Sequence, residues 1–218
     1  KGLYATVPPG GDPSKVPVDP FLVAGKLTAD SILAYHTALE FHGKAHSPTN
    51  EFFYLTQLSA RPLTFRGQRF RGVRPPAALL QKGAELSNVS EADRMGVRLR
   101  VSNLERTMVD VLDRPQLGGG WEEIWRSLES VEFFDLDAVI EYALLLQNAT
   151  TIAKVGFFLE QHRERLMVEE HHLEQLRKHA PRTPHYLSRG SRRPGKLVAG
   201  WNLVVLPEVI DRRWQEVV

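Results

Sequence analysis

The stretch "RLRVSNLERTMVDVLDRP", residues 98–115, decides the fold, because it predicts a strand that runs directly into a helix. Its first part, "VRLRV" (97–101), alternates apolar and basic side chains, as a half-buried strand does. The apolar residues of the second part recur at helical spacing and form one stripe: Leu104, Met108, Val111 and Leu112. Pro115 ends the helix. This order predicts a sheet on which helices pack.

The polar residues at the start of this helix have structural roles that the sequence predicts. Ser102 and Glu105 fit the capping-box pattern, in which the serine side chain accepts a backbone N–H and the glutamate reaches back to the N–H of Ser102. Arg106 and Asp110 are four residues apart and are expected to pair on the helix surface. Together with Thr107 these residues are interpreted as a helix start and not as an active site.

The remaining segments predict an α+β fold, with a mixed β-sheet and packed helices followed by a helical layer and a returning C-terminal strand. "TADSILAYHTALEFHG" (28–43) shows helical spacing that ends at Gly43. The expected strands are "NEFFYLTQL" (50–58), a hairpin around residues 66–68, and the closing "WNLVVLP" (201–207). Helical periodicity is present over residues 121–129, 136–147, 151–162 and 167–179.

The composition is that of an ordinary globular chain. The 218 residues are 42% apolar and 25% charged, and they suffice for one large domain or two small ones. The sequence has no cysteine, which excludes a disulfide scaffold and a thiolate metal site and fits a cytoplasmic protein. No apolar run approaches the roughly 20 residues that a membrane span needs.

The chain is expected to divide into a short leading segment and one domain. Residues 1–19 combine a short apolar run with a segment rich in Pro and Gly, which indicates the last strand of an upstream domain and a linker. Because the sequence starts at Lys1 and not at Met, we expect it to be a piece of a longer protein. The domain, 20–218, has three predicted parts: a sheet-rich part (20–116), a helical part (117–190), and a loop with the closing strand (191–218).

Charge is distributed unevenly although the net charge is only +2. Residues 61–106 contain ten Lys and Arg against four Asp and Glu, a net +6, whereas residues 122–141 contain one against seven, a net −6. The basic residues of the hairpin region and of one later loop are candidate nucleic-acid contacts: Arg61, Arg66, Arg69, Arg71, Arg74, Arg192 and Arg193. Phe65 and Phe70 lie among them, as in surfaces that hold phosphates and stack on bases. The alternative is a solvated strand face with both phenylalanines buried.

The sequence predicts no catalytic residue, metal site or cofactor. Neither a P-loop nor a G-x-S-x-G motif is present. His171 and His172 lie on a strongly polar helix and are interpreted as part of a solvated face, because adjacent helix positions do not face each other. Asp110 and Asp113 are interpreted as helix-surface charges.

Several segments together resemble the AbiEi-type antitoxins, the transcriptional regulators of type IV toxin–antitoxin phage-defence systems. "LRVSNLERTMVDVLDRP" (99–115) resembles the motif region of this family, and "KGLY" (1–4) resembles the end of its N-terminal winged-helix domain. Four further segments are similar to its C-terminal domain: "ALEFHG" (38–43), "EFFYLT" (51–56), "GFFLE" (156–160) and "WNLVVLP" (201–207). The resemblance covers nearly the whole chain.

The resemblance implies that residues 20–218 are an antitoxin domain without enzymatic activity. The full-length protein would bind operator DNA through the missing winged helix, repress its own operon, and neutralise a nucleotidyltransferase-like toxin, by direct capture, by competition for its target or by modification of the toxin. Its motif residues Ser102, Glu105, Arg106, Thr107 and Asp110 keep structural roles. Two other functions stay open: a nucleic-acid-binding module that reads no base sequence, and a nuclease-like or nucleotidyl enzyme.

Overall fold

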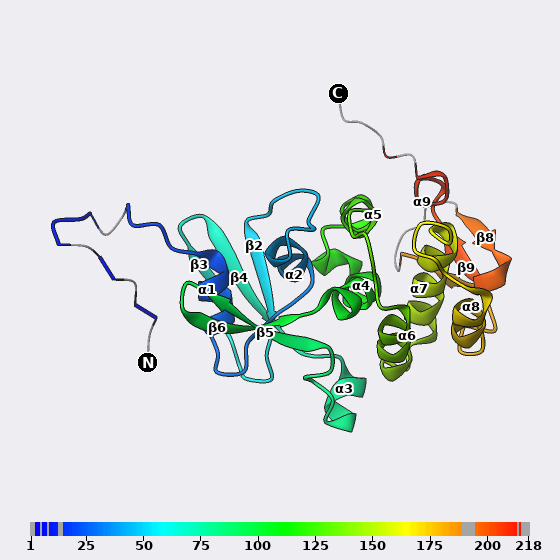
Figure 1. Ribbon diagram of the computed structural model, residues 1–218, viewed down its shortest axis with the longest axis horizontal. Coiled ribbons are helices and arrows are strands. Elements are labelled where there is room, and N and C mark those ends of the chain that lie inside the picture. Colours follow the sequence, from blue (N-terminus) through cyan, green and yellow to red (C-terminus); the bar gives the residue numbers. More distant parts are fainter. Residues whose placement is uncertain are drawn as a thin grey trace.

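The central element of the fold is a six-stranded mixed sheet (Figure 1). The computed structural model describes residues 3–4, 6–7, 9–12, 15–188, 195–212 and 214. In their order across the sheet, the strands are β3 (Leu63–Phe65), β4 (Gln68–Val73), β2 (Glu51–Leu55), β1 (Ile32–Leu33), β6 (Val97–Ser102) and β5 (Val89–Arg94). The pairs β1–β6 and β2–β4 are parallel and the other neighbours are antiparallel. The predicted α+β class with a mixed sheet is confirmed.

The two faces of the sheet are covered by different helices. Alternate residues of a strand point to opposite faces, so Phe52 packs with α1 (Pro20–Lys26), whereas Phe53 packs in the larger core that includes α4 (Leu104–Asp113). On the first face Phe52 stacks on Phe70 with ring centroids 5.4 Å apart. On the second face α4 continues directly from β6, as the opening stretch of the sequence predicts.

The helical layer lies beside the sheet and is joined to it through α4 (Figure 1). Its helices are α5 (Trp121–Glu129), α6 (Leu136–Leu145), α7 (Ala149–Gln161) and α8 (Glu170–Arg177). Their ends lie within a few residues of the predicted ones. Side-chain caps explain two of the starts, because Asp135 accepts the N–H of Ala138 and Asn148 accepts the N–H of Thr150. The predicted helical layer is confirmed.

The closing strand of the prediction is β9 (Leu203–Val205), and it belongs to a second, small sheet. There it lies between β7 (His185–Tyr186) and β8 (Lys196–Val198). Trp201, just before β9, packs against α7 at Gly156, where a Cβ atom would lie only 2.1 Å from the indole ring. The last helix among the described residues is α9 (Pro207–Asp211). The strand therefore returns to the helical layer and does not extend the central sheet.

Replacing Gly156 with alanine is expected to destabilise the protein, although alanine is the better helix former by about 1 kcal/mol. The indole ring of Trp201 fills the space that the new methyl group needs, and such overpacking costs about 1–3 kcal/mol. Urea unfolding measures the change. Gly200→Ala is the matched control, because no atom lies within 4 Å of its Cβ position. A Gly156→Ala protein as stable as the wild type would contradict the packing described here.

One predicted helix is wrong in its first half. Residues 32–33 form β1, and only the second half of the segment is helical, as α2 (His36–Phe41). Tyr35 separates the two with φ 57° and ψ −136°, a conformation that no helix residue adopts. The expected end is correct, since Gly43 has φ +67°. Two short helices, α1 and α3 (Ala77–Lys82), and the polar strand β5 were not predicted, because none shows a clear apolar period.

None of the described residues among 1–19 lies in a strand. Asp19 instead caps α1, with its Oδ1 accepting the backbone N–H groups of Phe21 at 2.8 Å and Leu22 at 3.2 Å. That residues 1–19 end an upstream domain stays a prediction. Across the described part of the chain, every helix is too short or too polar to cross a membrane.

Candidate functional site

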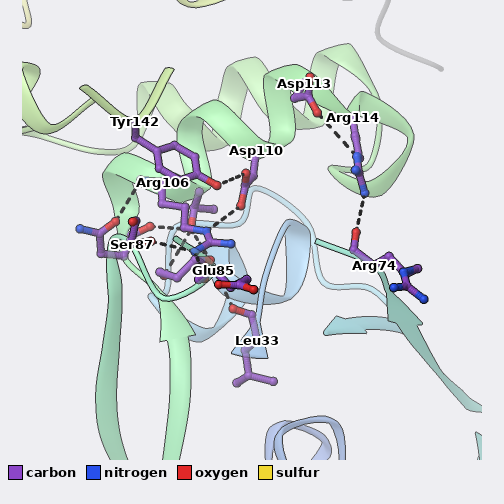
Figure 2. Close-up of polar contacts among 12 residues, drawn as sticks. Leu33, Arg74, Glu85, Ser87, Arg106, Asp110, Asp113, Arg114 and Tyr142 are labelled. Carbon is purple, nitrogen blue, oxygen red and sulfur yellow. Dashed lines mark hydrogen bonds and ion pairs between the residues drawn. The ribbon is translucent and has the colours of Figure 1, made fainter. Parts of the chain in front are cut away.

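The polar residues of the opening motif meet in a buried network where β6 passes into α4 (Figure 2). The guanidinium Nε of Arg106 lies 3.2 Å from Oδ2 of Asp110, and the two side chains are 0% and 1% exposed. The prediction of a helix-surface pair is therefore wrong. The sheet and the helical layer also close over this side of α4, which the spacing of two charged residues alone cannot reveal.

Arg106 connects three parts of the chain that are distant in sequence. Its Nη1 donates to the backbone carbonyls of Glu85 and Ser87, each at 2.7 Å, in the segment before β5. Its guanidinium also lies 5.2 Å from the centre of the Tyr142 ring on α6. The Tyr142 hydroxyl donates to Oδ1 of Asp110 at 2.8 Å, as Figure 2 shows. The network thus joins α4, α6 and the approach to β5.

The charges and the burial of this network keep Arg106 and Tyr142 in their protonated forms. Burial alone would lower the pKa of Arg106, but the neighbouring Asp110 outweighs it and the pKa is raised. Burial raises the pKa of the Asp110 carboxyl, against the opposing effect of Arg106. Burial and the Asp110 charge raise the pKa of Tyr142 well above its ordinary value. Arg106 and Tyr142 therefore stay protonated at neutral pH, and neither can act there as a base.

The start of α4 lies one residue later than the capping-box prediction places it. Asn103 is the N-cap, and its Oδ1 accepts the N–H of Arg106 at 3.0 Å. Ser102 is still paired with Val89 in the sheet, so its hydroxyl cannot cap the helix. It instead shares a hydrogen bond of 2.9 Å with Thr107 Oγ1 and donates to the carbonyl of Leu33.

Glu105 does not reach back to Ser102 as a capping box requires. Its Oε1 accepts the backbone N–H of Asp135, at 3.3 Å, just before α6. Neither Ser102 nor Glu105 therefore makes the hydrogen bond that the predicted capping box assigns to it. The motif residue Glu105 still has a structural role, because it links the first turn of α4 to the first turn of α6.

Asn103→Ala is expected to lower the free energy of unfolding by about 0.5–2 kcal/mol, because it removes the side-chain acceptor that caps the start of α4. Asn103→Asp keeps an acceptor at that position and serves as the control, with stability close to that of the wild type. Chemical denaturation at neutral pH measures both variants. An unchanged midpoint for Asn103→Ala would show that the cap contributes nothing.

A second polar centre, not predicted from the sequence, is built on Glu123 of α5. Its Oε1 accepts from His36 Nε2 (3.1 Å), the backbone N–H groups of His46 (2.9 Å) and Ser47 (3.1 Å), and Ser127 Oγ (2.9 Å). Its Oε2 accepts from the Ser47 hydroxyl at 2.6 Å. Burial alone would raise the pKa of Glu123, but these hydrogen bonds outweigh it and lower the pKa to about 2. No local pattern could reveal this centre, since most partners precede Glu123 by more than 70 residues.

The predicted hairpin is present, and its turn residues Arg66 and Gly67 have φ of 50° and 76°. The alternative in which both phenylalanines are buried is half correct, because Phe70 is buried whereas Phe65 is 38% exposed. Arg69 and Arg71 point to the face opposite Phe70.

Two of the candidate arginines already have partners within the fold. Arg71 lies 3.6 Å from Glu51 and 5.0 Å from the centre of the Phe53 ring. Arg66 donates to the carbonyl of Val16. Three others are exposed and lie in the loop before β3, on β4 and just after β4: Arg61, Arg69 and Arg74. Arg192 and Arg193 lie outside the described residues.

One group of three potential metal ligands occurs among the described residues: Asp137, His171 and His172. The prediction of a solvated face is wrong for His172, which is buried and caps α8. Its Nδ1 accepts the N–H of Glu169 at 3.0 Å, so the neutral ring carries its proton on Nε2, the atom that faces Asp137 at 4.0 Å. A metal ligand needs a lone pair at that atom, and the arrangement therefore fits a helix cap better than a metal site.

A hollow of about 650 Å³ at the C-terminal ends of α5 and α7 contains another histidine. His162 Nε2 lies 2.9 Å from Glu129 Oε1, and its Nδ1 donates to the carbonyl of Phe158 at 2.8 Å. Both ring nitrogens are thus engaged by acceptors.

Asp113 also departs from the prediction of a helix-surface charge. Its side chain is largely buried, and its Oδ1 accepts from the side chains of Asn148 and Thr151. It therefore joins the end of α4 to the start of α7. Asp110 and Asp113 belong to two separate hydrogen-bonded groups and do not form a pair of carboxylates facing one site.

These features define a class: an α+β domain whose distinctive polar motif holds a mixed sheet against a helical layer. No protein-family model and no curated protein matches the chain. Among solved structures, the chain is similar to the crystal structure of the Rv2827c protein from Mycobacterium tuberculosis. The TM-score is 0.54 at 16% identity, and the match covers 88% of this chain and 69% of that chain. At this identity the similarity shows the fold alone, and the resemblance to AbiEi-type antitoxins stays a prediction.

Proposed function

We propose that this chain is the antitoxin domain of a type IV toxin–antitoxin system and has no catalytic role of its own. The basis is the resemblance of residues 99–115 and five further segments to AbiEi-type antitoxins. In this proposal the domain belongs to a longer cytoplasmic protein that represses its own operon through an upstream winged helix bound to operator DNA. Its target is a nucleotidyltransferase-like toxin.

The observation that best supports a non-catalytic role is the position of the motif residues. Arg106, Asp110 and Thr107 are buried, and their hydrogen bonds to Glu85, Tyr142 and Ser102 join elements of the fold. This buried charge pair is interpreted as a structural device and not as a reactive centre, because Arg106 and Asp110 compensate each other's charge before any substrate arrives; only Nη2 of the Arg106 guanidinium has no hydrogen-bond partner among the described residues. The domain would then act through its surface.

Growth measurements test the antitoxin role. The proposal predicts a nucleotidyltransferase-like gene beside this one. Expressing that gene with and without the present chain tests the proposal, and we expect the chain to restore growth. Asp110→Ala, which damages the fold, is expected to lose protection, and Glu91→Lys, an exposed change on β5, is expected to keep it. Growth arrest that persists although the folded chain accumulates would contradict the proposal.

A second candidate function is a nucleic-acid-binding module that reads no base sequence, supported by the exposed Arg61, Arg69 and Arg74. Each phosphate contact should contribute about −0.9 to the slope of log affinity against log salt on duplex DNA. Arg69→Ala with Arg74→Ala should flatten the slope equally for all sequences, including the operator. Arg71→Ala is the control, since Arg71 is already near Glu51. No measurable affinity at about 50 mM salt would exclude this function.

A further inference from the structure

The helical layer presents two large apolar side chains to solvent beside acidic groups. Phe133, between α5 and α6, is 65% exposed, and Met167, before α8, is 68% exposed. The side chains of Asp137 and Glu169 next to them are 83% and 74% exposed. These four residues are called the acidic patch. Exposed apolar groups rimmed by charge are typical of protein interaction sites.

The two loops of the acidic patch are neighbours in space. Arg165 Nη1 donates to the carbonyl of Val131 at 2.9 Å, which ties the segment before α8 to the segment before α6. His172 of α8 lies 4.0 Å from Asp137 of α6. Phe133 and Met167 therefore belong to one surface at the N-terminal ends of these helices.

The backbone holds Met167 outward at a conformational cost. Met167 has φ 53°, in the left-handed region that residues with a Cβ atom rarely adopt. The residues on either side of it, Leu166 and Val168, are buried. The segment is thus anchored twice in the core, and the strained residue between the anchors points its apolar side chain to solvent. Such strain tends to occur where a surface has a function.

The opposite end of the molecule has a surface of matching character and opposite charge. Strand β3 is the last strand of the sheet, and Leu63 and Phe65 on it are 36% and 38% exposed. Arg61 precedes Leu63 in the sequence. Arg66 follows Phe65, and its guanidinium lies 5.1 Å from the centre of the Phe65 ring. These four residues are called the basic edge. The basic edge belongs to the central sheet and the acidic patch to the helical layer, so the two surfaces lie on different parts of the molecule (Figure 1).

We propose that the acidic patch of one molecule docks on the basic edge of a second copy of this chain. Each surface offers two exposed apolar side chains as anchors, and the carboxylates of Asp137 and Glu169 are opposite in charge to the guanidinium groups of Arg61 and Arg66. The contact uses two different surfaces, so it is head-to-tail, and it leads to open chains or rings. The inference concerns self-association and holds whether or not the chain is an antitoxin.

Sedimentation velocity of the whole chain over a range of concentrations tests this contact. We expect the average sedimentation coefficient to rise with concentration, and the association to weaken about tenfold or more between about 50 and 500 mM salt, because exposed charges are screened. Asp137→Lys with Glu169→Lys reverses the acidic patch, and Arg61→Glu with Arg66→Glu reverses the basic edge. Each double variant alone brings like charges together and is expected to be monomeric.

Mixing the two double variants provides the decisive measurement. Contacts between the two different variants again pair opposite charges, so we expect association to return in the mixture as dimers or alternating assemblies of the two. Glu91→Lys with Glu122→Lys changes the net charge as much as the reversed acidic patch does, but outside both surfaces, and should associate like the wild type. Circular dichroism verifies that every variant is folded. A wild-type chain that stays monomeric at all concentrations, or reversed variants that associate as it does, would overturn the proposal.

Discussion

Asp110→Ala is expected to lower the free energy of unfolding by about 3–5 kcal/mol, because it leaves the buried guanidinium of Arg106 without its counter-charge. The Tyr142 hydroxyl loses its acceptor in the same step. Urea unfolding at neutral pH measures the effect, and the variant should also expose apolar surface and bind a hydrophobic dye if the sheet separates from the helical layer.

Two further variants separate charge from packing in this network. Asp110→Asn keeps the shape of the side chain and removes its charge. It should therefore be nearly as unstable as Asp110→Ala. Tyr142→Phe removes one hydrogen bond to a charged group and leaves the ion pair intact, and it should cost about 1.5–3 kcal/mol. If Asp110→Asn were as stable as the wild type, the ion pair would not be what holds this junction together.

The second large effect is a loss of stability at low pH, and it depends on Glu123. The pKa of this carboxyl falls from its ordinary value of 4.5 to about 2 in the folded protein, which corresponds to about 3 kcal/mol. A carboxyl whose pKa is lower in the folded state contributes its full stability above the unfolded value, and it loses that contribution as the pH falls. The loss is therefore expected between about pH 4.5 and pH 2.

Comparison of the wild type with Glu123→Gln at several pH values isolates this contribution. At pH 7 the variant should be less stable by about 3 kcal/mol, and the difference should shrink as the pH approaches 2. Glu132→Gln is the control, since the Glu132 side chain pairs with Lys44 but is 83% exposed. A difference between wild type and Glu123→Gln that stays constant from pH 7 to pH 2 would refute the assignment.

The sequence by itself determined the local elements. The turn at Arg66 and Gly67, the strand over residues 97–101, and the four helices from residue 121 onward were all predictable, because each depends on residues a few positions apart. Apolar alternation specifies which face of a strand is buried, and a period of 3.6 does the same for a helix. These short-range patterns were enough for the α+β class.

Only the tertiary structure decided how the polar residues are used. The spacing of Arg106 and Asp110 allows a pair, but their burial depends on Tyr142 and on the segment before β5. Ser102 could have capped α4, but its pairing in the sheet moves the cap to Asn103. The partners of these side chains lie up to several tens of residues away, and a hydrogen bond between distant residues leaves no periodic signal in the sequence.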